Sequence, residues 1–242
     1  MTDGAAHFWA AGTVVVPLTC ALLVFVFPRR AVQGTLAAVV GILVCSAATV
    51  RDVIEGGARR LAVGGWGSPL GIELHVDGLS SLMLAVTVVV GTVSTVYARG
   101  YLAHRSVSDS REDHAGDESE RGHPWFWPLW LSLWGSLNAL FLSADLFNLY
   151  VTLELIGLSS TALIAMAGVA PALTAAARYL LVSLVGSFCY LAGVGFVYAA
   201  CGTLDIDQVG RLIHDGTLPA VALALMTAGL LLKTALFPLH FW

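Results

Sequence analysis

The sequence predicts an all-α polytopic membrane protein with about seven transmembrane helices. Of its 242 residues 57% are hydrophobic and 12% are charged, and the mean hydropathy is +0.82. Soluble domains carry roughly 25% charged residues, so this composition is that of a membrane protein. Apolar windows of about 20 residues, the length of a bilayer-spanning helix, recur along the whole chain. The strands of a membrane β-barrel would instead alternate over about ten residues.

Charge and cysteine usage exclude several function classes. The net charge of −4 and the pI of about 5.9 give no indication of nucleic-acid binding. The four cysteines lie in or beside apolar segments and form no C-x-x-C motif, which argues against metal, haem, iron–sulfur and disulfide sites. We therefore expect no cofactor, no metal and no catalytic residue in this chain. The first apolar window is not a cleavable signal, because Arg29-Arg30 follow it rather than precede it.

The N-terminal region, residues 1–103, contains three predicted spans, at about 8–27, 31–50 and 79–98. The segment between the second and third spans is polar and rich in turn residues. Apolar and polar residues alternate in part of it, so we predict an extra-membrane hairpin near 60–77. Residues 104–124 are the only long charged stretch and show no hydrophobic periodicity. We interpret them as a solvated, disordered loop, with partner docking as the alternative.

The C-terminal region, residues 125–242, resumes with an aromatic interface cluster. Its predicted spans lie at about 125–143, 146–168 and 178–201, with a seventh from near 218. Basic residues near span ends indicate the orientation in the membrane. An N-terminus outside the membrane is favoured by Arg29, Arg30, Arg99, Arg105 and Arg178, and the opposite orientation by Arg51, Arg59 and Arg60.

Two ionisable residues are predicted inside the bilayer. Glu154 lies near the middle of the fifth span, where an ionisable group costs several kcal/mol and usually faces the interior of the helix bundle. Its structural alternative is a neutral acid that links helices by hydrogen bonds. Lys233, the only lysine of the chain, lies in the apolar seventh span. Its alternative is snorkelling to the surface, but a desolvated lysine loses its proton readily, unlike arginine. We predict that the two form a proton-transfer pair.

Several other residues are candidates near this pair. Pro238 breaks the seventh span and leaves the carbonyl of Thr234 without its helical donor, and His240 follows it. Helices broken at membrane depth recur at ion sites in transporters. Tyr150 lies one turn before Glu154. Asp145 at the start of the fifth span is either a helix cap or a supporting residue, and Arg178 is either an interface anchor or a relay residue.

These segments resemble the antiporter-like membrane subunits of respiratory complex I, membrane hydrogenases and Mrp sodium/proton antiporters, nearest to Mrp D-type and complex I N-type members. Residues 142–155 look like the fifth-helix motif of that family, with its glutamate at Glu154. Residues 233–242 look like its broken seventh helix, with its lysine at Lys233. Pieces of 65–80 and 202–206 resemble the entry into helix three and the exit of helix six.

The resemblance implies a proton half-channel in the plasma membrane, partner subunits of the same complex and an N-terminus outside. It implies no redox centre in this chain, although the complex could be an NADH:quinone oxidoreductase. The resemblance leaves open whether the complex transports sodium. Family members have about fourteen helices in two inverted repeats, whereas this chain stops inside the first broken helix. The resemblance therefore implies a truncated antiporter-like fold with an incomplete first repeat: a fragment, a truncated or split gene product, or a module completed by another chain.

The leading hypothesis is therefore the N-terminal half of a proton-translocating subunit. Glu154 and Lys233 transfer the proton, and His240, Asp145, Tyr150 and Arg178 support them. The alternative is a non-transporting membrane scaffold that helps to assemble the complex. The scaffold predicts unchanged activity when Glu154 and Lys233 are neutralised, and the transporter predicts its loss.

Overall fold

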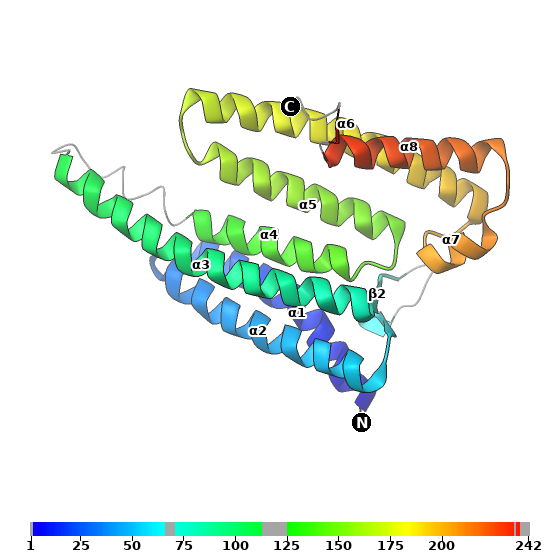
Figure 1. Ribbon diagram of the computed structural model, residues 1–242, viewed down its shortest axis with the longest axis horizontal. Coiled ribbons are helices and arrows are strands. Elements are labelled where there is room, and N and C mark those ends of the chain that lie inside the picture. Colours follow the sequence, from blue (N-terminus) through cyan, green and yellow to red (C-terminus); the bar gives the residue numbers. More distant parts are fainter. Residues whose placement is uncertain (1, 66–70, 113–124, 235, 238–242) are drawn as a thin grey trace. The chain divides into compact units, whose positions relative to one another are not determined.

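The computed structural model describes residues 2–65, 71–112, 125–234 and 236–237, and almost all of them are helical (Figure 1). The elements are α1 (Thr2–Val26), η1 (Pro28–Arg30), α2 (Ala31–Gly56), β1 (Arg59–Ala62), η2 (Val63–Gly65), β2 (Glu73–Val76), α3 (Gly78–Glu112), α4 (Phe126–Phe141), α5 (Leu146–Ala165), α6 (Ala170–Cys201), α7 (Ile206–Leu212) and α8 (Thr217–Lys233). Five described helices, α1, α2, α3, α5 and α6, are long and apolar enough to cross a membrane. The predicted all-α membrane fold is confirmed. The approximate count of seven spans is reached when the shorter helices α4 and α8 are added to these five.

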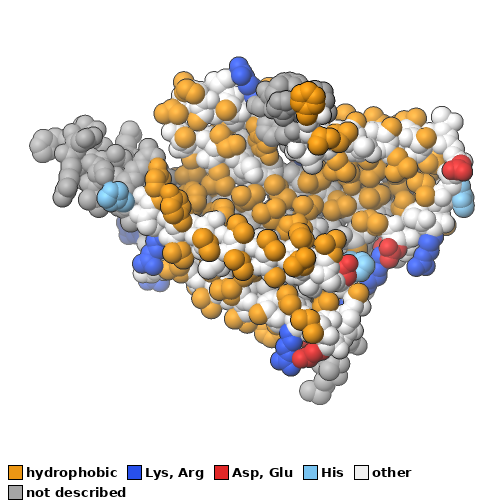
Figure 2. Space-filling model, viewed as in Figure 1, with side chains coloured by type: hydrophobic (Ala, Val, Ile, Leu, Met, Phe, Trp, Pro, Cys, Tyr) orange, Lys and Arg blue, Asp and Glu red, His pale blue; other side chains and the backbone are white. Residues whose placement is uncertain are grey.

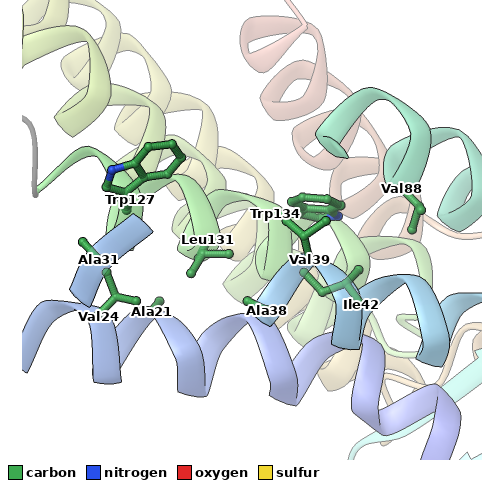
Figure 3. Close-up of a cluster of buried hydrophobic side chains, with 10 residues drawn as sticks. All are labelled: Ala21, Val24, Ala31, Ala38, Val39, Ile42, Val88, Trp127, Leu131 and Trp134. Atoms are coloured by element: carbon green, nitrogen blue, oxygen red, sulfur yellow. The ribbon is translucent and has the colours of Figure 1, made fainter. Parts of the chain in front are cut away.

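The first unit comprises residues 1–59 and 76–141, and it contains α1 to α4. Its core is apolar and aromatic, with Trp127, Leu131 and Trp134 of α4 buried against small and branched residues of α1 and α2 (Figure 3). Glycine makes this packing close: a Cβ at Gly135 would lie 2.9 Å from a methyl carbon of Leu18. The unit is therefore held by interdigitated side chains of ordinary apolar type.

The second unit comprises residues 60–75 and 142–242, with β1, β2 and α5 to α8. The two strands form a two-stranded sheet, and Leu74 extends it by an antiparallel bridge to Ser143. A second antiparallel bridge joins Asp145 to Asp205. These pairings bring the starts of α5 and α7 to one place in the unit. They satisfy backbone groups that the connecting segments would otherwise leave unpaired.

The described structure differs from the sequence-based expectations in three ways. The third helix continues to Glu112, into the stretch interpreted as a loop, because no Pro or Gly interrupts residues 101–112. The remainder of that loop, 113–124, lies outside the described residues. The fourth helix packs with the first three rather than with the later ones, because its tryptophans fill their core. The short helix α7 has no counterpart among the predicted spans.

Hydrophobic side chains cover the helices, whereas charged side chains gather near helix ends and connections (Figure 2). Large apolar residues are exposed on helices of both units, for example Val89 at 63% and Phe188 at 62%. Exposed apolar surface on this scale is unfavourable in water but is the expected surface of helices in lipid. The side-chain distribution therefore agrees with a multi-pass membrane protein.

Candidate functional site

The helix that carries the acidic residue of the site begins at a well-defined cap. Oδ1 of Asp145 accepts hydrogen bonds from the backbone N–H groups of Phe147 (2.8 Å) and Asn148 (2.9 Å). Such caps satisfy donors that the first turn of a helix leaves unpaired. Burial raises the pKa of Asp145, the two backbone hydrogen bonds lower it, and the nearby charge of Asp205 raises it again, with a net rise. The capping interpretation of Asp145 is thus supported.

Glu154 lies about two and a half turns into α5 and makes its contacts with two other helices. Its Oε1 lies 3.2 Å from Nζ of Lys233 at the end of α8. The same oxygen accepts a hydrogen bond from Oγ of Ser187 on α6. The side chains of Glu154 and Lys233 are 18% and 9% exposed. The two ionisable residues predicted from the sequence are therefore paired within the second unit.

Lys233 has a further oxygen partner and a favourable position. Its Nζ lies 3.1 Å from Oγ of Ser183, one helical turn before Ser187 on α6. Lys233 is the last residue of α8, where unpaired backbone carbonyls favour a positive charge. Its ammonium group can thus donate to a carboxylate and to a hydroxyl at the same time. This geometry differs from snorkelling, in which the ammonium group would reach into water.

Glycines allow α6 and α8 to approach closely enough for these contacts. A Cβ at Gly186 would lie 2.9 Å from the carbonyl oxygen of Gly229 and 3.4 Å from Cγ of Lys233. A Cβ at Gly157 on α5 would lie 3.2 Å from Oγ of Ser183. At Gly186 a larger residue would have to push the helices apart, because a methyl carbon cannot lie 2.9 Å from a backbone oxygen. The space beside Gly229 is thus occupied by the backbone of α6.

The remaining sequence candidates lie in different surroundings. Tyr150 packs beside the apolar cluster of the second unit, and the centroid of its ring lies 5.9 Å from the centroid of the Phe147 ring. Arg178 is exposed near the start of α6. His240 and Pro238 lie outside the described residues, so the helix break stays a prediction. Sequence reasoning missed Ser183 and Ser187, although their spacing of four on an apolar helix places both on one face.

Sequence reasoning also missed a second polar cluster in this unit, which is centred on Arg60 of β1. Its guanidinium group contacts the carboxylates of Asp205 (2.6 Å), Asp207 (2.6 Å) and Glu73 (3.3 Å). The side chain of Asp205 is only 3% exposed, whereas that of Asp207 is 53% exposed. From the sequence, Arg60 counts only as one of the basic residues that indicate the orientation of the chain in the membrane. No set of three or more His, Cys, Asp or Glu in the described parts of the chain is arranged to hold a metal ion.

Two family models match the chain. Residues 143–242 match the model described as "NADH:quinone oxidoreductase/Mrp antiporter, TM". Residues 65–109 match the model described as "NADH-Ubiquinone oxidoreductase (complex I), chain 5 N-terminus". The first match contains Glu154, Ser183, Ser187 and Lys233, so the complete described site falls within it.

Curated relatives and solved structures agree with these matches. NADH-quinone oxidoreductase subunit N of Desulforudis audaxviator is 34% identical over 237 residues, covering 95% of this chain and 44% of that protein. The D-type subunit of the Na(+)/H(+) antiporter of Alkalihalophilus pseudofirmus is 30% identical over 218 residues, covering 88% of this chain and 41% of that protein. A chain of the Mrp complex from Dietzia sp. DQ12-45-1b is similar with a TM-score of 0.77 and 27% identity, over 100% of this chain and 43% of that one.

A chain of the archaeal membrane-bound sulfane sulfur reductase is similar with a TM-score of 0.82 and 25% identity, over 96% of this chain and 46% of that one. The present chain thus spans less than half the length of the relatives it matches. Both family models, the curated relatives and the structural neighbours indicate the same group of proteins. The chain belongs to the family of antiporter-like membrane subunits that NADH:quinone oxidoreductases and Mrp sodium/proton antiporters share.

Proposed function

We propose that this chain belongs to a proton-translocating subunit of a multisubunit membrane complex, and that Glu154 and Lys233 are its proton-transfer pair. One observation carries the proposal: an ion pair of 3.2 Å joins two apolar helices, with both side chains largely shielded. A buried ion pair is weak evidence for stability, because desolvation of both charges offsets their attraction. An ionisable pair at membrane depth is better explained by a function.

The pair supports transfer because burial and proximity act on its charge state in opposite directions. A proton that moves from Nζ of Lys233 to Oε1 of Glu154 converts ammonium and carboxylate into amine and carboxylic acid. Dehydration favours the neutral state, and proximity of the partners favours the charged state. A small change in their separation therefore decides where the proton resides. Lysine suits this role, since arginine stays charged in proteins.

The supporting residues have roles of different kinds in this proposal. Asp145 caps α5 and so positions the helix that carries Glu154. Tyr150 packs on the same helix between the cap and the carboxylate, and Arg178 anchors the start of α6 at the membrane interface. His240 is the residue that accepts the proton after Lys233 in the proposed path.

The transported ion, the partners and the location follow from the family as proposals. We propose protons as the transported species, with sodium as a second ion in an antiporter complex. The named relatives are subunits of an NADH-quinone oxidoreductase and of Na(+)/H(+) antiporters, which supports other membrane subunits as partners. Any redox reaction would take place in those partners. We place the chain in the plasma membrane, surrounded by lipid, with its N-terminus outside.

Proton transport in inverted membrane vesicles tests this function in the complex as it occurs in its membrane. Glu154→Gln and Lys233→Met should each abolish transport that depends on this subunit, when the rate is normalised to subunit abundance. Ser136→Ala is the control, because that buried hydroxyl bonds only to the carbonyl of Ser132 in its own helix. Normal transport in both site variants would contradict the proposal. A scaffold role would then follow, with reduced yield of the complex only after bulkier substitutions.

A further inference from the structure

We propose that Ser183 and Ser187 of α6 are positioning residues for the Glu154–Lys233 pair. In this view Ser187 holds the carboxylate, and Ser183 gives the ammonium group a second oxygen partner to which it can turn when it leaves the carboxylate. The inference rests on the proposed transport function, and it adds a third helix to a pair that is carried by α5 and α8.

The first argument is the way in which hydrogen bonds are shared at the site. Oε1 of Glu154 accepts from both Ser187 and Lys233, and Nζ of Lys233 donates to both Glu154 and Ser183. Each charged group therefore has one partner in the pair and one hydroxyl on α6. Since a hydroxyl can donate or accept, each serine can satisfy its partner in more than one protonation state.

The second argument is that three other hydroxyls within helices of this unit bond differently. Thr152, Thr161 and Thr174 each donate to a backbone carbonyl three or four residues earlier in their own helix. This is the usual arrangement for serine and threonine in apolar helices. Ser183 and Ser187 instead contact charged side chains of neighbouring helices. Their hydrogen bonds thus depend on the arrangement of three helices.

The third argument is that glycines bring α5 and α8 close to the part of α6 that carries the two serines. Ser183 faces Gly157 of α5, and Gly186 lies between the two serines against Gly229 and the stem of Lys233. Both serines are buried, at 7% and 1% exposure. A relative shift of α6 against α5 or α8 would change the distances of both charged groups to their hydroxyls. The serines therefore couple helix position to the charge state of the pair.

The titratable side chains that share these helix faces are few. Lys233 comes from α8, Tyr150 lies one turn before Glu154 on α5, and Tyr190 lies three residues after Ser187 on α6. Each serine contacts one member of the pair, Ser187 the carboxylate of Glu154 and Ser183 the ammonium group of Lys233.

The test compares Ser183→Ala and Ser187→Ala with the unmodified protein in native membrane vesicles. We expect each substitution to reduce the rate of proton transport roughly tenfold, because each removes a hydrogen bond to a charged group. The acid limb of the pH–rate profile should move to higher pH in S187A, and the alkaline limb to lower pH in S183A. Ser187→Thr, which retains the hydroxyl, should restore most of the rate. Ser136→Ala, the control, should leave rate and profile unchanged.

A chemical readout separates this inference from the transport function itself. A hydrophobic carbodiimide reacts with protonated carboxyl groups in membranes, and mass spectrometry of the peptide with Glu154 gives the extent of labelling. In S187A, labelling should extend to higher pH than in the unmodified protein, since a carboxylate that loses a donor holds its proton more readily. This readout requires no transport, so it stays valid if Glu154→Gln leaves transport intact.

Two outcomes would overturn the inference. One is unchanged labelling and an unchanged pH–rate profile in both alanine variants at normal abundance, which would make the serines structural. The other is an equal loss of rate in Ser187→Thr and Ser187→Ala, with complex abundance preserved in both, which would show that the hydroxyl is not the group that matters. Loss of transport in E154Q together with either outcome would leave the proposed function intact and remove only the role of the serines.

Discussion

The two units of this protein differ in where their buried charges lie, because the second unit has ion pairs between elements, whereas several buried hydroxyls of the first bond within their own helix. In the first unit Thr35, Thr49 and Thr95 are almost fully buried, and each donates to a carbonyl of its own helix. In the second unit some shielded polar groups instead contact charged partners on other elements, as Lys233 does with Glu154 and Asp205 with Arg60. Polar groups satisfied within one helix add little to helix association. Charges paired across helices make their contacts depend on the relative positions of those helices.

The largest expected effect comes from removing one charge of the pair. Lys233→Met or Glu154→Gln leaves a buried charge without its partner, which should destabilise the second unit by about 3–5 kcal/mol if the remaining group stays charged. The double variant should lose much less, because no uncompensated charge remains. Thermal denaturation in detergent of the two single variants and the double variant gives the coupling free energy. Strictly additive losses would show that the pair contributes no interaction.

A smaller effect is expected where α6 and α8 are in closest contact. Gly229→Ala would place a methyl group against the backbone of Gly186 and Tyr190, and overpacking of this kind costs about 1–3 kcal/mol. Gly195→Ala on α6 is the matched control, because among the described residues no atom outside the adjacent backbone of its own helix lies within 4 Å of the position that its Cβ would take. The control should gain up to about 1 kcal/mol of helix propensity. Equal melting temperatures for the two variants would contradict the close packing.

The Arg60 cluster should contribute less than the pair, because it is partly exposed. Arg60→Met removes the partner of the nearly buried Asp205 and should cost about 1–3 kcal/mol, the penalty for an unsatisfied buried group. Arg51→Met is the control, since the exposed Arg51–Glu55 pair lies within one helix and exposed pairs contribute little. Melting temperatures at low and high salt provide the measurement. A larger loss in R51M than in R60M would contradict this ranking.

The cap of α5 should give a modest pH dependence. Because burial raises the folded-state pKa of Asp145, its contribution to stability is complete below the usual aspartate pKa of about 3.9 and is lost as the pH rises through the higher folded value. Asp145→Asn keeps a good cap but removes the titration. We expect a flatter melting-temperature profile above pH 4 for D145N, with a difference of about 1 kcal/mol or less. An unchanged profile would contradict the effect.

The smallest effect is expected in the first unit. Thr35→Val removes a hydroxyl that shares the carbonyl of Ala31 with the helix backbone, so we expect a change within about 0.5–1 kcal/mol and an unaltered pH–rate profile. Ser187→Ala in the second unit should alter that profile. If both substitutions had the same effect on transport, the contrast between the units would not hold.

Much of the site could be predicted from the sequence, because its charged residues are rare. Glu154 and Lys233 stand out as ionisable residues in apolar helices, and one-dimensional hydropathy is sufficient to find them. Ser183 and Ser187 do not stand out, since a serine is compatible with an apolar helix and only its contact with a charge on another helix distinguishes it. Arg60 and Asp205 are separated by more than 140 residues, and nothing in their local sequence indicates their pairing.

The fold, like the site, depends partly on local sequence and partly on contacts between distant segments. Apolar windows of bilayer length, with caps such as Asp145 and breakers such as Gly and Pro, determine by local physics that this chain forms membrane helices and approximately where they end. Which helix packs against which depends on side-chain shape over long sequence separations. Trp134 places α4 with the first three helices, and Gly186 and Gly229 bring α6 onto α8. The sequence by itself therefore determined a polytopic helical protein with two unusual ionisable residues, and only the tertiary structure decided that they meet beside two hydroxyls, because that depends on the close approach of three helices.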